Sequence, residues 1–265
     1  MKLCACIAVA LALLMPGSSR AAEIVKVAVR PGVTESYLLM VDPSAPPKAV
    51  ALMFTGGEGR VKLPDDISEL KFWRRANFLV RARGIFRDPE LAVAIVDVPS
   101  DRRSGMDDSF RASGTHADDI RIVIADLKQR LPEAKVFLVG TSRGTLSAAY
   151  VGRTTGDSVA GVVLTSTLFD GGNMGIGLRD FDFKSIHGRL LFVHHQNDAC
   201  KWTPHREALR QAQKGYTLIT IIGGKPPESG PCDPLSAHGY FGKEEVTVNA
   251  IKNWMFGRSY PQTAE

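Results

Sequence analysis

The sequence predicts an α/β domain with a mostly parallel central sheet that helices cover on both faces. Continuous apolar runs such as 49–54 and 136–139 suit strands whose two faces are both buried. Between them, residues 116–131 carry apolar side chains at helical spacing. The 265 residues are 44% hydrophobic and 23% charged, which excludes fibrous and disordered classes. A chain of this length can bury a sizeable core.

The first 21 residues read as a secretory signal peptide, which leaves residues 22–265 as one domain. Lys2 gives the positively charged N-terminal region, residues 3–15 form the apolar core, and small residues form the expected cleavage site after Ala21. Cleavage after Ala22 is an alternative. The apolar run is too short to span a bilayer, and no later stretch is long enough. We therefore expect a periplasmic or secreted protein with no membrane span after signal removal.

The elements of the domain follow one another with short connections. An antiparallel pair is expected at 24–29 and 37–41, around the turn Pro31-Gly32. Pro132 ends the helix 116–131, and no internal repeat or linker interrupts the chain. The remaining expected elements are strand 49–54, the glycine-rich turn 55–59, strand 91–98, strand 136–139, a helix over 146–150, strand 161–164, strand 190–194, a helix capped by Thr203 with Pro204 in its first turn, strand 217–222 and a last helix over 244–255.

The pentapeptide Gly140-Thr141-Ser142-Arg143-Gly144 joins a predicted buried strand to a predicted helix. Glycine at both ends suits a sharp turn in which a Cβ would collide with the neighbouring strand or helix. Such a turn would expose the Ser142 hydroxyl above the sheet, and the N–H of Arg143 would face negative charge on a substrate oxygen. A purely structural turn is the alternative.

With strand, glycine turn, serine turn, acid and histidine in this order, the chain resembles the α/β-hydrolase superfamily, in particular its secreted bacterial serine hydrolases. The resemblance implies a triad whose acid and histidine follow Ser142. Asp198, just beyond strand 190–194, is the expected acid, and Asp170 is its main rival. His238, in the loop after the last strand, is the expected base. His205 is less suited, because it lies at the positive end of a helix.

The resemblance also places a second oxyanion donor in the turn after strand 49–54. Gly57 is the expected donor and Gly56 the alternative, since glycine lets the backbone approach a ligand closely. Thr55 stands where many lipases and esterases carry a histidine, so the sequence leaves open which backbone amide, that of Gly56 or of Gly57, faces inward.

One cysteine pair remains after signal removal, because Cys4 and Cys6 leave with the signal. In an oxidising compartment we expect Cys200 and Cys232 to form a disulfide. The bond would restrict the unfolded chain by roughly 3 to 4 kcal/mol. It would also tie the loop of Asp198 to the loop of His238. Simple extracellular stabilisation is an equally good interpretation.

Several function classes are disfavoured. Loss of the signal removes Lys2 and Arg20 and no acid, which lowers the formal net charge from +5 to +3. The basic clusters are short, so no nucleic-acid partner is expected. His194 and His195 are neighbours on a strand and point to opposite faces, which disfavours a metal site. No cofactor is expected, and the glycine-rich turn lacks the lysine of a phosphate loop.

The sequence therefore predicts an exported serine hydrolase of the α/β-hydrolase fold, acting on a small acyl substrate. It would cleave a carboxylic ester or related acyl bond through an acyl-serine intermediate. Too few residues separate strands 161–164 and 190–194 for a large cap domain. Acyl transfer or peptidase action on the same fold is one alternative, and a binding protein that has lost the chemistry is another. The oligomeric state stays unknown.

Overall fold

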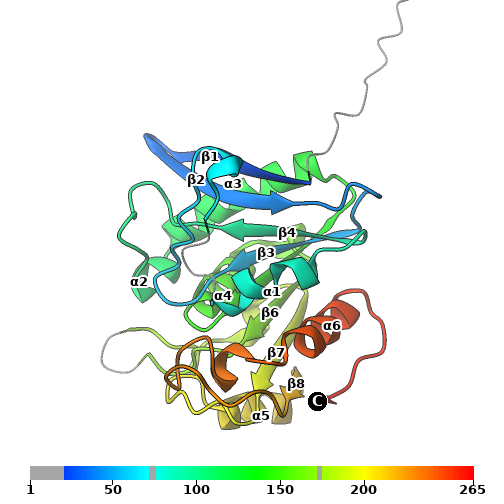
Figure 1. The fold of residues 1–265 in the computed structure, drawn as a ribbon. Coiled ribbons are helices and arrows are strands. Elements are labelled where there is room, and N and C mark those ends of the chain that lie inside the picture. The colour runs from blue at the N-terminus through cyan, green and yellow to red at the C-terminus, as the bar shows by residue number, and fades with distance from the viewer. Residues whose placement is uncertain (1–20, 72–75, 172–174) are drawn as a thin grey trace, which may run out of the picture.

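The computed structural model describes residues 21–71, 76–171 and 175–265, and the predicted signal peptide lies almost entirely outside these ranges. The described residues form one nine-stranded sheet in the order β1-β2-β4-β3-β5-β6-β7-β8-β9 (Figure 1). The pairs β1-β2 and β2-β4 are antiparallel, and every other pair is parallel. The strands are β1 (Ala22–Arg30), β2 (Val33–Met40), β3 (Ala49–Phe54), β4 (Leu91–Val96), β5 (Lys135–Thr141), β6 (Gly161–Thr165), β7 (Arg189–His195), β8 (Thr217–Ile221) and β9 (Thr263–Ala264).

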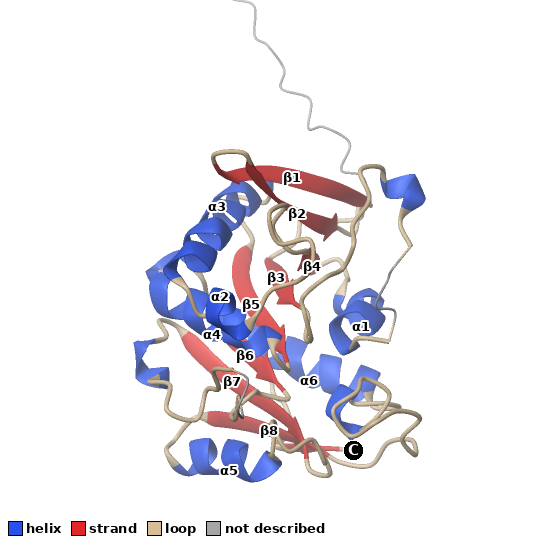
Figure 2. Cartoon of the chain, turned by 90° about the vertical axis from the view of Figure 1, so that its left-hand side faces the viewer, coloured by secondary structure: helices blue, strands red, loops and turns tan. Residues whose placement is uncertain are grey.

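Helices cover both faces of this sheet, as the continuous apolar runs predict. Apolar residues of α3, α4 and α5 join one hydrophobic cluster with one face of the strands, and those of α1 and α6 join a second cluster on the other face (Figure 2). Both β3 and β4 are buried at every position. The helices are α1 (Phe78–Phe86), α2 (Asp108–Arg111), α3 (Gly114–Arg130), α4 (Gly144–Thr154), α5 (His205–Gln213) and α6 (Glu244–Met255).

Some element ends differ from those expected, each because of a hydrogen bond to a side chain. Strand β4 stops at Val96 because the Asp97 carboxylate leaves the strand to accept hydrogen bonds from the N–H groups of Val61 and Leu63. Helix α3 begins at Gly114 because the Ser113 side chain accepts from the N–H of His116.

The expected cap of α5 is wrong. The residue at the N-cap position is Pro204, which makes no side-chain capping bond, and the helix begins at His205. The hydroxyl of Thr203 donates instead to the carboxylate of Asp198, at 2.8 Å. A capping hydroxyl accepts from a helix N–H, whereas this hydroxyl is turned toward a charged acceptor, which is a strong partner, so a contact with Asp198 replaces the capping pattern.

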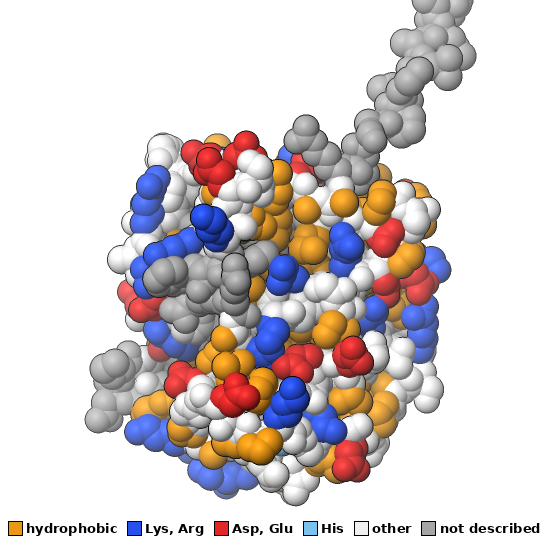
Figure 3. Space-filling view, in the orientation of Figure 1, with side chains coloured by type: hydrophobic (Ala, Val, Ile, Leu, Met, Phe, Trp, Pro, Cys, Tyr) orange, Lys and Arg blue, Asp and Glu red, His pale blue; other side chains and the backbone are white. Residues whose placement is uncertain are grey.

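The surface shows no dominant sign of charge on the face seen in Figure 3, where basic and acidic side chains are interspersed. Among the residues described, no helix combines the length and the apolar character needed to cross a bilayer.

Candidate active site

The serine turn has the strained geometry that its glycines predict. Strand β5 ends at Thr141, and Ser142 follows with φ +53°, in the left-handed region that side chains rarely adopt. A Cβ on Gly140 would lie 2.5 Å from the carbonyl oxygen of Gly144, and one on Gly144 would lie 2.1 Å from that of Phe54. Only glycine therefore fits at either position. The N–H of Ser142 donates to the carbonyl of Thr165 at 3.0 Å, which ties the turn to β6.

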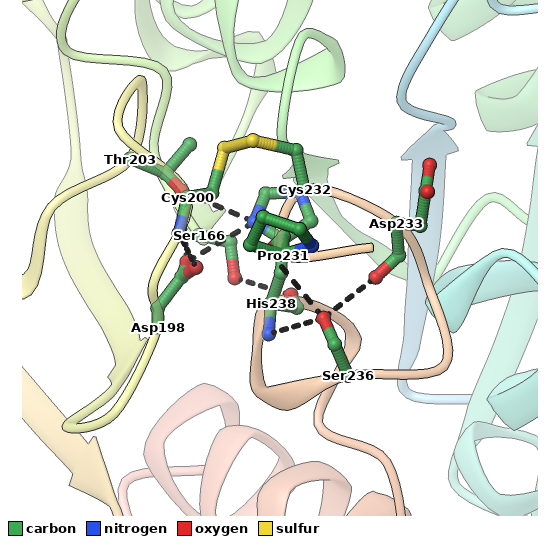
Figure 4. Close-up of a disulfide and its surroundings, with 9 residues drawn as sticks. All are labelled: Ser166, Asp198, Cys200, Thr203, Pro231, Cys232, Asp233, Ser236 and His238. Carbon is green, nitrogen blue, oxygen red and sulfur yellow. Dashed lines mark hydrogen bonds and ion pairs between the residues drawn. A yellow bond between two sulfur atoms is a disulfide. The ribbon is translucent and has the colours of Figure 1, made fainter. Parts of the chain in front are cut away.

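His238 and Asp198 form a direct pair although they lie on different loops. His238 belongs to a short 3₁₀ turn, Ala237–Gly239, and its Nδ1 is 3.0 Å from Oδ2 of Asp198, which follows β7 (Figure 4). Both residues are buried, at 5% and 9% exposure. An ionised carboxylate can only accept, so Nδ1 carries the hydrogen and Nε2 keeps a free lone pair.

The Asp198 carboxylate has further donors that hold it in place. Oδ1 accepts from the N–H of Cys200 at 2.9 Å, and Oδ2 accepts from the hydroxyl of Thr203 at 2.8 Å. The same hydroxyl lies 3.1 Å from Nδ1 of His238. Thr203 thus touches both members of the pair, and nothing in its sequence context distinguishes it from a helix cap.

Buried hydroxyl groups fix the backbone beneath His238. The Ser166 hydroxyl donates to the carbonyl of His238 at 2.7 Å, and the Tyr240 hydroxyl donates to the carbonyl of Val193 at 2.7 Å. The N–H of Ser166 in turn donates to the Tyr240 oxygen at 2.9 Å. Burial raises the pKa of Tyr240, so the phenol stays protonated and keeps this role. The imidazole is therefore anchored to the ends of β6 and β7.

Ser142 and His238 line the same cavity, whose volume is about 220 Å³. The serine turn contributes Thr141 and Ser142, and the loop after β3 contributes Gly56 and Gly57. The other lining residues are Ala76, Asn77, Phe78, Cys232, Asp233, Pro234, His238 and Gly239. The three residues expected to act together are thus connected in two ways. Ser142 and His238 line one cavity, and one hydrogen bond joins His238 to Asp198.

The rivals of the acid and the base lie elsewhere. Asp170 forms an exposed ion pair with Arg179, at 3.1 Å. His205 makes a 3.1 Å hydrogen bond with the Thr220 hydroxyl on β8. Neither side chain lines the cavity of Ser142.

A fully buried arginine shapes the loop after β3. Arg111 is 0% exposed and donates to the carbonyls of Thr55 and Gly57 at 3.2 and 3.1 Å, and to the Ser147 hydroxyl at 2.9 Å. Gly57 has φ +61°, a conformation open to glycine. Hydrogen bonds from Arg111 to the carbonyl oxygens of the loop therefore fix its backbone. Sequence reasoning did not find Arg111, because arginine is usually a surface residue.

The two predicted oxyanion donors are backbone N–H groups of the serine turn and of the loop after β3. The backbone N–H groups of Gly57 and Arg143 donate to no other residue in the described ranges. Gly57 lines the cavity, whereas the Arg143 side chain turns to Asp108 in an ion pair of 2.6 Å. The Arg143 amide, directly after Ser142 at the start of α4, is the part of this residue that can meet a ligand.

The expected disulfide is present. Cys200 and Cys232 are bonded, with their Cα atoms 4.6 Å apart and a separation of 32 positions in the sequence. Cys200 donates its N–H to Asp198, and Cys232 lines the cavity (Figure 4). The covalent link therefore joins the loop of the acid to the wall of the cavity that contains His238.

The two adjacent histidines of β7 have separate environments. His194 is fully buried, its Nε2 accepts from the N–H of Thr167 at 2.9 Å, and burial lowers its pKa to about 3. His195 instead bonds through Nε2 to the carbonyl of Gly223 at 2.8 Å. In the part of the chain that the structure describes, no three His, Cys, Asp or Glu side chains gather as metal ligands would.

Comparison with known proteins identifies the fold. No protein-family model and no curated protein matches the sequence. Among solved structures, a serine hydrolase without a lid from Xanthomonas campestris is 12% identical, with a TM-score of 0.59 over 91% of this chain and 97% of that one. Est1E from Butyrivibrio proteoclasticus with bound ferulic acid is 14% identical, with a TM-score of 0.61 over 88% and 98%. This chain has the α/β-hydrolase fold. A dienelactone hydrolase from Anabaena variabilis shares that fold, at 13% identity, a TM-score of 0.54 and coverage of 89% and 95%.

Within the α/β-hydrolase fold, the described chain carries no large cap domain, as expected. The cavity of Ser142 opens beside the loops that follow β3 and β8.

Proposed function

We propose that this protein is an exported serine hydrolase that cleaves a carboxylic ester or related acyl bond. The observation that carries the proposal is that Ser142 and His238 line one cavity, and that Nδ1 of His238 lies 3.0 Å from the carboxylate of Asp198. Structures with this fold include hydrolases that act on acyl compounds, which supports the same general chemistry. The disulfide is consistent with export, since such bonds persist in oxidising compartments.

In the proposed mechanism, Oγ of Ser142 attacks the carbonyl carbon of the substrate, and its proton moves to Nε2 of His238. Asp198 stabilises the imidazolium through the hydrogen bond to Nδ1. The N–H groups of Gly57 and Arg143 would stabilise the oxyanion. Collapse expels the alcohol, which takes the proton from His238. Water then attacks the acyl-serine with His238 as the base, which releases the acid and restores Ser142.

A short acyl group suits the cavity. Its volume of about 220 Å³ lies below the range of roughly 300 to 1,000 Å³ that holds drug-sized ligands. The apolar wall at Phe78 and Pro234 can contact an acyl chain of a few carbons. We therefore expect p-nitrophenyl acetate and butyrate to be better substrates than the corresponding octanoate and longer esters.

A fluorophosphonate probe tests the proposal directly, because it reacts only with an activated serine. The folded wild type should become labelled at Ser142, and Ser142→Ala should not. Labelling of Ser142→Ala at the wild-type level, or no labelling of the folded wild type, would show that the chain is not a serine hydrolase acting through Ser142. Competition by added alcohol or amine for the acyl group then separates hydrolysis from acyl transfer.

A further inference from the structure

The cavity of Ser142 is also lined by a side-chain amide, which belongs to Asn77. Asn77 precedes α1 as its N-cap residue and lines the cavity together with Ser142. A Cβ built on Gly56 would lie 3.1 Å from Cβ of Ser142 and 3.7 Å from Nδ2 of Asn77. The amide nitrogen and the serine therefore flank the same small space, just above the glycine-rich loop.

The orientation of this amide follows from its other contact. Oδ1 of Asn77 accepts a hydrogen bond from the N–H of Leu79 at 3.1 Å, as an N-cap side chain should. A flipped amide would place an NH₂ group against an N–H donor, so the cap fixes the nitrogen on the side of Gly56. The helix cap thus places the donor end of the amide beside Gly56, at the wall of the cavity.

A rigid donor at this place has an evident chemical use. Negative charge develops on the carbonyl oxygen when Ser142 attacks, and preorganised donors beside that oxygen lower the barrier. Thr55, which stands where many lipases carry a histidine, instead donates its hydroxyl to the carbonyl of Gly59 at 3.1 Å. Its side chain is therefore committed within the loop, whereas the Asn77 amide faces the cavity.

We propose that Asn77 is a catalytic residue whose side-chain N–H donates to the oxyanion, alongside the backbone donors. This inference rests on the proposed serine hydrolase function and adds a residue from the start of α1 to the site. It also gives α1 a role in the chemistry, because the helix cap and the oxyanion donor are the two ends of one amide group.

The cap allows the catalytic role to be separated from the structural one. Asn77→Asp and Asn77→Ser both retain an oxygen that can accept from the N–H of Leu79, because Asp and Ser are good N-cap residues. Neither retains the amide donor. Asn77→Ala removes both contacts. Asn249→Asp, an exposed change on α6, serves as the matched control for the added charge.

The measurement is kcat and KM with p-nitrophenyl acetate, together with the melting temperature of each variant. We expect Asn77→Asp and Asn77→Ser to melt close to the wild type, to lose roughly 100- to 1,000-fold in kcat, and to keep KM within a few fold, as removal of one oxyanion donor does elsewhere. Asn77→Ala should lose a similar factor in kcat and also melt lower. Asn249→Asp should behave as wild type.

Other results would overturn the assignment. Wild-type kcat in both Asn77→Asp and Asn77→Ser would leave Asn77 as a helix cap only. A raised KM at unchanged kcat would make it a substrate-binding residue and not an oxyanion donor. A trifluoromethyl ketone inhibitor gives an independent readout, since its affinity should fall by the same factor as kcat/KM. An inactive, unlabelled wild type would instead overturn the proposed function itself.

Discussion

Replacing both Cys200 and Cys232 by alanine would remove the covalent link between the loop of Asp198 and the wall of the cavity. The bond closes a loop of 32 residues, which on the chain-entropy model contributes roughly 3 to 4 kcal/mol to the free energy of unfolding. For a domain of this size the melting temperature should fall by about 10 °C. The loss should be visible by thermal unfolding followed by circular dichroism.

The same change should also slow the reaction. Asp198 keeps its hydrogen bonds to Cys200 N–H and Thr203, so the carboxylate is not released, but its loop is no longer tied to position 232. Small displacements of a base cost large factors in rate, and we expect kcat to fall roughly 10- to 100-fold. The assay is turnover of p-nitrophenyl acetate well below the melting temperature of the variant.

Reduction of the wild type by dithiothreitol provides the control, because it breaks the bond without changing the side chains. Reduced wild type and the double alanine variant should lose similar factors in kcat, and the reductant should not affect the variant further. A lower melting temperature with unchanged turnover would refute the idea that the disulfide aligns acid and base. The bond would then act on stability alone.

Substitutions at three other positions have distinct expected outcomes. Thr203→Val should lower kcat roughly tenfold, because the Asp198 carboxylate loses a hydrogen-bond donor. Thr203→Ser keeps the hydroxyl and should have a kcat close to that of the wild type. Equal rates in all three proteins would exclude a positioning role for Thr203. Buried Glu35 has no hydrogen-bond partner for its carboxylate among the residues described, and burial, with Asp119 and Asp97 adding, raises its pKa well above 4.5. Its contribution to the free energy of unfolding is complete below about pH 4.5 and is lost as pH rises through the folded pKa. In denaturant melts, the free energy of unfolding of Glu35→Gln should therefore increase relative to that of the wild type from pH 5 to 8. Burial, with Arg111 adding, lowers the pKa of His116 from 6.5 to about 3, so stability present above pH 6.5 is lost as pH falls toward 3. At pH 5 the wild type should have lost about 2 kcal/mol of its free energy of unfolding through His116, and His116→Leu should not show this loss. Parallel curves of unfolding free energy against pH for the variant and the wild type would contradict this role of His116.

The strands and the serine turn could be predicted from the sequence because their causes are local. The run 49–54 is apolar at every position, and β3 occupies that range. The glycines at 140 and 144 are required by contacts with their immediate neighbours in the turn and at the end of β3. In the α/β-hydrolase fold the acid and the histidine follow the serine along the chain, which limits the candidates for both. The expected pair, Asp198 and His238, lies 3.0 Å apart.

Other parts of the site depend on contacts that the sequence does not display. The start of α1, Phe78-Leu79-Val80, is a run of buried apolar residues without a polar face, so it gives no clear helical period. Arg111 is buried because it satisfies carbonyl oxygens from a loop more than fifty positions earlier. Thr203 looks like a helix cap until a carboxylate five residues before it takes its hydroxyl.

The cavity wall consists of two halves of different origin. Gly56, Thr141 and Ser142 lie at or just beyond the ends of β3 and β5, and a Cβ added to Gly56 would lie 3.1 Å from both Cβ of Ser142 and the carbonyl oxygen of Thr141. The opposite half comes from the connection before α1 and from residues 232–234, which no strand constrains. Substrate preference can therefore drift through exchanges at positions such as Pro234 while the reacting groups stay unchanged. Laboratory evolution toward a new acyl group should find most of its tolerated mutations on that outer half.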